Sequence, residues 1–316
     1  MEKEFGLGPL AFEMTTAAYL MSQGFAVDFH DFDSGGGYDF LAISGSTEIE
    51  VECKHVSADI GRQIHRAKIY QLGAALRSTI ESFLYSNRGG KLVTVALPGR
   101  LTSDKEHQHA LAHHIRTALF DELCHIEDLI CSISSQSFDV TACPFFRTNR
   151  DVTEDTIRTY LEQELGINNR ATLVALRRPT SALIISFHSV KPDKVIPSIL
   201  KTLKTDTKSQ FSGAHPAFLC IYLADLDHKQ LRYLANIEHS GTITGFSSIV
   251  STLFESRPHL HTIAWMSEGE VRITRKRSHN RIDTSTREAA PCYAFKNQRH
   301  PAAKEALLNR LFIANH

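Results

Sequence analysis

The first hundred residues alternate between apolar and polar positions in ways typical of short strands and amphipathic helices. An apolar set at helical spacing lies between Pro9, which suits a first turn, and Gly24, which suits a stop. Gly45 and Ser46 separate two strand-like runs and predict a tight hairpin. The pattern predicts the order α-β-β-β-α-β, with elements near residues 10–21, 25–29, 38–44, 47–54, 57–85 and 91–97.

The remaining two thirds of the chain again mix helical and strand-like patterns, without a sequence repeat. The segment from Pro144 to Asp151 is typical of a connection. We therefore expect an α/β protein with one domain over residues 1–146 and a second α/β region over residues 147–316, an accessory domain to which no motif assigns a role.

Composition narrows the choice of function class. The 316 residues include 35 Lys and Arg against 35 Asp and Glu, so any contact with nucleic acid must come from a local basic patch. The chain has no run of 18 apolar residues and no signal-peptide pattern, which argues against a membrane partner. Its six cysteines are widely spaced, which disfavours a disulfide framework or zinc ribbon and favours a reducing, cytoplasmic location.

The segment Thr47–Lys54 carries the candidate chemistry. Alternation along a strand sends Ile49, Val51 and Cys53 toward a core and places Glu48, Glu50, Glu52 and Lys54 on the other face. Asp39 lies on the preceding strand, and hairpin pairing can bring it close to Glu52. Two carboxylates beside an ammonium group suit Mg²⁺ binding and phosphodiester chemistry, because carboxylate oxygens hold the ion and the Lys can orient or deprotonate a water.

The pattern Asp39-x12-Glu52-Cys53-Lys54, within the α-β-β-β-α-β order, resembles the PD-(D/E)xK nuclease superfamily, whose fold is called restriction-endonuclease-like. Tyr38 stands where the family usually has Pro. The resemblance implies a nuclease that uses Mg²⁺, or Mn²⁺ in its place, with Asp39 and Glu52 as ligands and Lys54 as the catalytic Lys. It also implies a further metal-site carboxylate at Glu13 and a Gln beside the site, either Gln63 or Gln71.

The resemblance further implies a nucleic-acid substrate, most often double-stranded DNA, with RNA and single strands left open. Members often serve in defence, as toxins, in repair or in mobile elements, and a homodimer or a partner protein would be in keeping with them. The alternative is a catalytically silent, nuclease-like subunit that binds nucleic acid or acts as a scaffold. A third interpretation leaves the four charged residues as an exposed strand face that is merely solvated or salt-bridged.

A basic run near the C-terminus is a second candidate for contact with nucleic acid. Such a run can neutralise phosphates, although an ordinary solvated hairpin would carry the same residues. The residues concerned are Arg272, Arg275, Lys276, Arg277 and Arg281.

Other functional motifs are weak or missing from the sequence. His109 and His113 have a spacing that can chelate zinc, but a solvated helix face explains them better. No P-loop, no G-x-S-x-G elbow and no dinucleotide-binding glycine pattern occurs.

Overall fold

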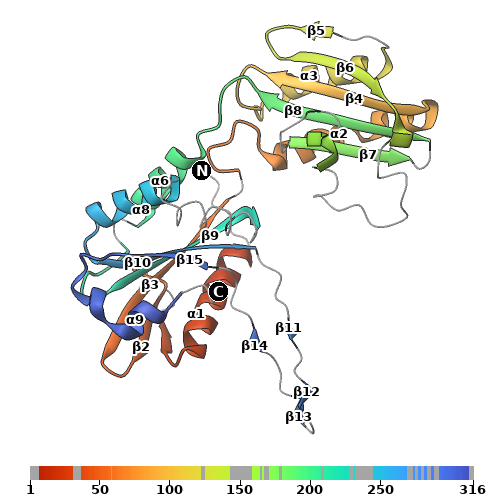
Figure 1. Ribbon diagram of the computed structural model, residues 1–316. Coiled ribbons are helices and arrows are strands. Elements are labelled where there is room, and N and C mark those ends of the chain that lie inside the picture. The colour runs from red at the N-terminus through yellow and green to blue at the C-terminus, as the bar shows by residue number, and fades with distance from the viewer. Residues whose placement is uncertain are drawn as a thin grey trace. The chain divides into compact units, whose positions relative to one another are not determined.

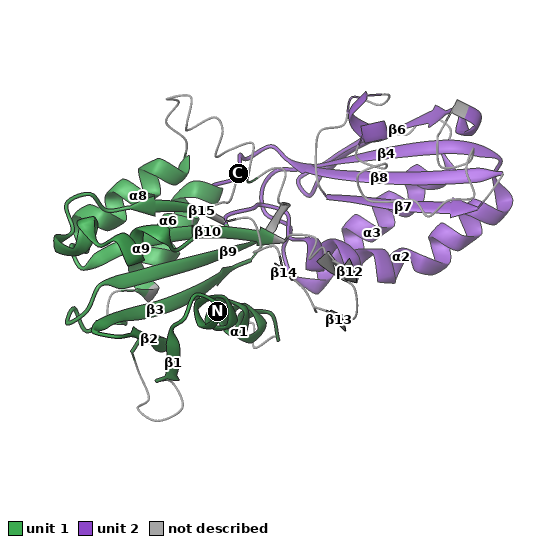
Figure 2. Ribbon diagram, turned by 60° about the horizontal axis from the view of Figure 1, so that its bottom comes forward, with its two compact units in different colours: residues 1–60, 195–316 green, residues 61–194 purple. Residues whose placement is uncertain are grey.

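The structure is a computed structural model that describes residues 7–30, 37–57, 59–121, 125–142, 159–163, 166, 171–177, 180–207, 210–227, 231, 245–268, 273–274, 277–278, 281–282, 286–287 and 292–312. It is mixed α/β, which confirms the expected class. The chain divides into two compact units, shown in Figure 2. Unit 1 combines Met1–Ile60 with Val195–His316, and unit 2 is Gly61–Lys194. The expected boundary at residues 146 and 147 differs from this division, because unit 2 is inserted into unit 1.

Unit 1 is built on a six-stranded sheet with the order β1-β2-β3-β9-β10-β15 (Figure 1). The pairs β3–β9 and β9–β10 are parallel, and the other neighbouring strands are antiparallel. The strands are β1 (Ala26–Phe29), β2 (Phe40–Ser44), β3 (Thr47–Val56), β9 (Ala217–Asp227), β10 (Leu260–Glu268) and β15 (Cys292–Lys296).

Helices cover both faces of the unit 1 sheet. Figure 2 shows α1 (Leu7–Ser22) on one face and α6 (Val195–Asp206) with α8 (Gly245–Ser256) on the other. Phe12 and Leu20 of α1 pack with Val51 of β3. On the opposite face, α6 and α8 pack on apolar residues of β9 and β10. Strand β3 is therefore buried from both sides, which is why so few of its residues reach solvent.

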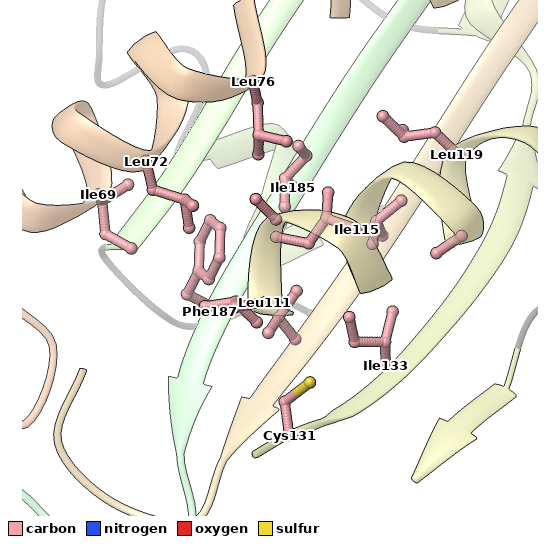
Figure 3. Packing of buried hydrophobic residues seen from close by; sticks show 14 of the residues in the cluster. Ile69, Leu72, Leu76, Leu111, Ile115, Leu119, Cys131, Ile133, Ile185 and Phe187 are labelled. Carbon is pink, nitrogen blue, oxygen red and sulfur yellow. The ribbon is translucent and has the colours of Figure 1, made fainter. Parts of the chain in front are cut away.

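Unit 2 has its own five-stranded sheet, with the order β5-β6-β4-β8-β7. Figure 3 shows how the apolar faces of two helices meet this sheet, for example where Leu72 and Ile115 approach Ile185 and Phe187. Its helices are α2 (Arg66–Ser86), α3 (Lys105–Phe120) and the 3-10 turn η1 (Val140–Ala142). Its strands are β4 (Gly89–Leu97), β5 (His125–Glu127), β6 (Ser132–Phe138), β7 (Ala171–Arg177) and β8 (Ser181–Ser189).

Two expectations about the first hundred residues are wrong. The second helix begins at Arg66 rather than near residue 57, and β4 pairs with β6 and β8 instead of joining the sheet that contains β3. The place beside β3 is taken by β9, where Cys53 and Cys220 are register partners. A continuous apolar run such as residues 91–97 indicates a buried strand but carries no information about which strand it pairs with.

The C-terminal part of unit 1 contains short paired strands between β10 and β15. Strand β11 (Ile273–Thr274) pairs with β14 (Thr286–Arg287), and β12 (Arg277–Ser278) pairs with β13 (Arg281–Ile282). The 3-10 turn η2 (Pro301–Lys304) and α9 (Ala306–Arg310) follow. In the part of the chain that the structure describes, no helix is both long and apolar enough to cross a membrane.

Candidate active site

The β2–β3 hairpin determines where Asp39 lies. Gly45, with a φ of 61°, forms the turn, and the register pairs Phe40 with Val51. The main-chain N–H of Asp39 donates to the carbonyl of Val51 at 3.0 Å, and the Asp39 carboxylate accepts a hydrogen bond from the Cys53 N–H at 2.6 Å. Asp39 immediately precedes β2, and these two bonds hold it against residues 51–53 of β3, the stretch that contains Glu52.

Glu52 and Lys54 form an ion pair on β3. The Nζ of Lys54 lies 2.5 Å from Oε1 of Glu52, and the Glu52 side chain is 0% exposed while that of Lys54 is 20% exposed. Removing a carboxylate from water costs several kcal/mol unless a cation or hydrogen-bond donors compensate for it. The ammonium group of Lys54 supplies this compensation and still reaches solvent.

The register assigns these two side chains to a particular face of the sheet. Glu52 is paired with Leu219 of β9 and Lys54 with Ile221, and both partners belong to the core on the α6 and α8 side. Cys53 points to the opposite face, toward the core that includes α1. The strand therefore separates the ion pair from the first helix.

Each of the other two glutamates on this face has a partner of its own. Glu50 is buried and accepts hydrogen bonds from the main chain of Ser212, at 2.9 Å, and from the Ser212 hydroxyl. Glu48 lies 3.3 Å from Nε2 of His215. The expectation of an exposed strand face is wrong for Glu50 and Glu52, which are buried, whereas a salt bridge on this face is present between Lys54 and Glu52. No local sequence pattern indicates Ser212 or His215, since they reach β3 through tertiary pairing of β9.

Glu13 does not complete a three-carboxylate site. It is half-buried on α1, whose residues Phe12 and Thr16 are buried. Among the residues that the structure describes, no three His, Cys, Asp or Glu side chains are grouped so that they could hold a metal ion. The expectation that Glu13 joins Asp39 and Glu52 is wrong, because α1 packs on the face of β3 that carries Cys53.

Gln63 is placed differently from the expectation. It precedes α2, belongs to unit 2, and donates its side-chain amide to the carbonyl of Pro192 at 3.2 Å. Its main-chain N–H donates to the Asp193 carboxylate at 2.8 Å. Through these contacts Gln63 connects the start of unit 2 to residues 192 and 193 near its end. Gln71, the other candidate, is exposed on α2.

The C-terminal basic run is described in part. Arg272, Arg275 and Lys276 lie outside the described residues. Arg277 and Arg281 lie on the paired strands β12 and β13, which agrees with a hairpin in this segment.

Burial keeps the cysteine of the motif protonated. The pKa of the Cys53 thiol is raised well above its usual value, first by burial, then by its interaction with Cys220 and by the charge of Asp39, while a hydrogen bond with Thr16 acts in the opposite direction. A neutral thiol is a poor nucleophile and a poor metal ligand. Cys53 is thus a packing residue, and the chemistry of the site belongs to the carboxylates and the amine.

No protein-family model, no curated protein and no solved structure matches this chain. The functional argument therefore depends on the residues of the site themselves: the buried Glu52 carboxylate, the Asp39 carboxylate bonded to the Cys53 N–H, and the partly exposed Lys54 amine in contact with Glu52.

Proposed function

We propose that this chain is a Mg²⁺-dependent endonuclease of the PD-(D/E)xK type that hydrolyses phosphodiester bonds in DNA. The observation that carries the proposal is the buried Glu52 carboxylate, paired with Lys54 on the same strand, with the Asp39 carboxylate hydrogen-bonded to the N–H of the intervening Cys53. Burying a carboxylate destabilises the folded state because desolvation costs several kcal/mol. A buried acid of this kind is therefore a candidate functional residue.

The connectivity of unit 1 supports this proposal. In chain order, α1, β1, β2 and β3 are followed, after the insertion, by α6 and β9, and β9 pairs in parallel with β3. That is the α-β-β-β-α-β order of the restriction-endonuclease-like fold, with its last helix and strand supplied from beyond residue 194. The proposal thus replaces α2 and β4 by α6 and β9 in the core.

The residues present fit a small divalent ion. Asp39 and Glu52 offer carboxylate oxygens, the ligand type that Mg²⁺ prefers, and Mg²⁺ commonly takes only one or two protein carboxylates while waters and phosphate oxygens fill the rest of its shell. Two carboxylates are therefore enough, without Glu13. When bound, such an ion would polarise the phosphodiester and lower the pKa of a water.

The protein side chains have separate roles in this proposal. Glu52 and Asp39 supply the negative charge that attracts the ion, and the Cys53 N–H fixes the orientation of the Asp39 carboxylate. Lys54, whose ammonium group reaches solvent, orients or deprotonates the attacking water and offsets the charge that develops on the phosphate.

The proposal is tested by incubating the purified chain with supercoiled plasmid in Mg²⁺, in Mn²⁺ and in EDTA. We expect nicking with either metal and none in EDTA. The variants Lys54→Ala and Asp39→Ala should lose this activity while keeping the fold, and Lys201→Ala, which removes an exposed lysine from α6, is the matched control and should retain it.

Three results would contradict the nuclease proposal. Undiminished cleavage by Lys54→Ala would show that Lys54 is not the catalytic residue. Cleavage in EDTA would show that the reaction does not need a divalent metal. Retardation of the plasmid without cleavage in any metal would favour the silent binding or scaffold subunit instead. Single-stranded DNA and RNA, offered in parallel, determine the substrate class.

A further inference from the structure

Three chain segments meet at the end of unit 2 where the chain enters and leaves it. The main-chain N–H of Lys194 donates to the carbonyl of Gly61 at 2.7 Å, and that of Leu101 donates to the carbonyl of Gln63 at 3.1 Å. The side-chain amide of Gln63 adds a bond to Pro192. Residues 61–68, 97–101 and 190–194 are therefore held together by direct hydrogen bonds.

These segments bring the side chains of Lys68, Arg100 and Lys191 into one place beside the ring of His65; this group of four is here called the unit 2 basic cluster. A guanidinium nitrogen of Arg100 lies 2.8 Å from Nε2 of His65, and the Nζ of Lys68 donates to the carbonyl of Leu101 at 2.8 Å. The Nζ of Lys191 lies 3.7 Å from the position a Cβ would have on Gly99, next to Arg100. Arg100 and Lys191 are exposed.

The acceptors in these contacts are an imidazole ring and a main-chain carbonyl, so the contacts fix the cations without neutralising their charge. The pKa of Lys68 is lowered, first by burial and then by the charge of Arg100. Arg77, farther along α2, differs, because its guanidinium pairs with Glu81 at 2.9 Å.

Two carboxylates near these segments have other tasks. Asp193 accepts from the main chain of Gln63 at 2.8 Å and contacts Arg62 at 3.4 Å. Asp104 caps α3 by accepting from the His107 N–H at 2.8 Å. Like charges held together in this way raise the free energy of the protein unless an anion binds there.

The beginning of α2 adds to the positive potential. The helix has 21 residues, and its N-cap residue His65 makes no side-chain capping hydrogen bond. The partial positive charge of a helix N-terminus therefore lies beside the basic side chains, in the arrangement that favours phosphate groups.

We infer that the unit 2 basic cluster binds the phosphodiester backbone of a nucleic-acid duplex. The inference deepens the proposed function and rests on it for the choice of a nucleic acid as the anion. Arg100 offers a planar fork of donors that matches a phosphate, and Lys191 and Lys68 add point charges beside it. Contacts of this kind hold the duplex without reading its sequence. The inserted unit 2 is thereby assigned a part in substrate binding.

The test measures binding of the full chain to a labelled DNA duplex in EDTA, so that hydrolysis cannot occur, over a series of salt concentrations. The double variant Arg100→Gln/Lys191→Gln should bind more weakly and should reduce the slope of log K against log salt by about 2, because two phosphate contacts are lost. The matched control is Arg77→Gln/Arg116→Gln, which removes two exposed charges from the helices of unit 2 and should leave the slope unchanged.

The outcomes separate this inference from the proposed function. An unchanged slope for Arg100→Gln/Lys191→Gln, an equal loss in both double variants, or an absence of duplex binding by the unaltered chain would each overturn the inference, even if the chain cleaves DNA through Lys54. Binding that depends on Arg100 and Lys191 in a chain that never cleaves would uphold the inference and overturn the nuclease. Binding of anionic lipid vesicles through the cluster in place of duplex would also overturn it.

Discussion

The Nζ of Lys54 lies 2.5 Å from Oε1 of Glu52, two residues earlier on the same face of β3. Because Glu52 is 0% exposed, this short contact helps to compensate for the burial of its carboxylate inside unit 1. The pair therefore links the stability of the unit to the chemistry proposed for it.

The first prediction concerns the energetics of this pair. Lys54→Ala should lower the free energy of unfolding by about 1–3 kcal/mol, less than the 3–5 kcal/mol typical of a broken buried pair because Lys54 is in part exposed. Adding Glu52→Gln should restore part of the loss, since the uncompensated charge is then gone. Urea unfolding of the single and double variants measures the coupling. Additive losses would show that the pair contributes no coupling energy.

The second prediction concerns the divalent ion. Mg²⁺ should raise the melting temperature of the unaltered chain in a concentration-dependent way, because a ligand that binds the native state stabilises it. Asp39→Asn should abolish most of this shift, yet keep a side-chain oxygen that can accept from the Cys53 N–H. Thermal unfolding in a Mg²⁺ series, with Ca²⁺ as a non-reactive comparison, provides the measurement. An equal shift in Asp39→Asn would place the ion elsewhere.

The third prediction distinguishes two roles for Gln63. Because its side chain bonds the Pro192 carbonyl, Gln63→Ala should cost about 1 kcal/mol of stability and leave the rate of cleavage per folded molecule unchanged. Rate measurements are compared with unfolding curves on the same preparation. A large loss of cleavage rate in Gln63→Ala without a loss of stability would instead show that Gln63 takes part in catalysis.

The fourth prediction concerns acid stability. His261 is 0% exposed, stacks on Phe218 at 5.4 Å between ring centres, and has its pKa lowered to about 4 by burial first and then by the charges of His300 and Lys296. The folded state therefore keeps this ring neutral while the unfolded chain takes up a proton below its ordinary pKa near 6.5. The free energy of unfolding should therefore keep its full value above pH 6.5 and fall by up to about 3 kcal/mol as the pH is lowered toward 4.

The variant His261→Phe keeps the stacking on Phe218 and removes the titrating group. Its free energy of unfolding should depend less steeply on pH between 6.5 and 4 than that of the unaltered chain. Denaturant unfolding at several pH values measures both slopes. Identical slopes would assign the acid sensitivity to other groups, such as His259 and His300, whose pKa values burial also lowers.

The hairpin that carries Asp39 and Glu52 could be predicted from the sequence because every interaction that defines it is local. Gly45 provides the turn, and alternation along Thr47–Val56 decides which residues share a face. With the turn in place, the register that pairs Phe40 with Val51, and so brings Asp39 to the end of the ladder near residues 51–53, follows from counting residues. The α/β fold class could also be predicted, because the periodicity that distinguishes helices from strands is likewise local.

Which strand lies beside β3 was decided by tertiary structure alone. Cys53 and Cys220 are 167 positions apart in the chain and become register partners only when β9 enters the sheet, whereas β4 follows soon after β3 and pairs in unit 2. Buried apolar strands have the same pattern whichever sheet they join, so the pattern could not reveal the insertion. The burial of Glu50 and Glu52, the contact with Ser212 and the gathering of cations around Arg100 all depend on such long-range pairing, which is a property of the folded chain rather than of any local segment.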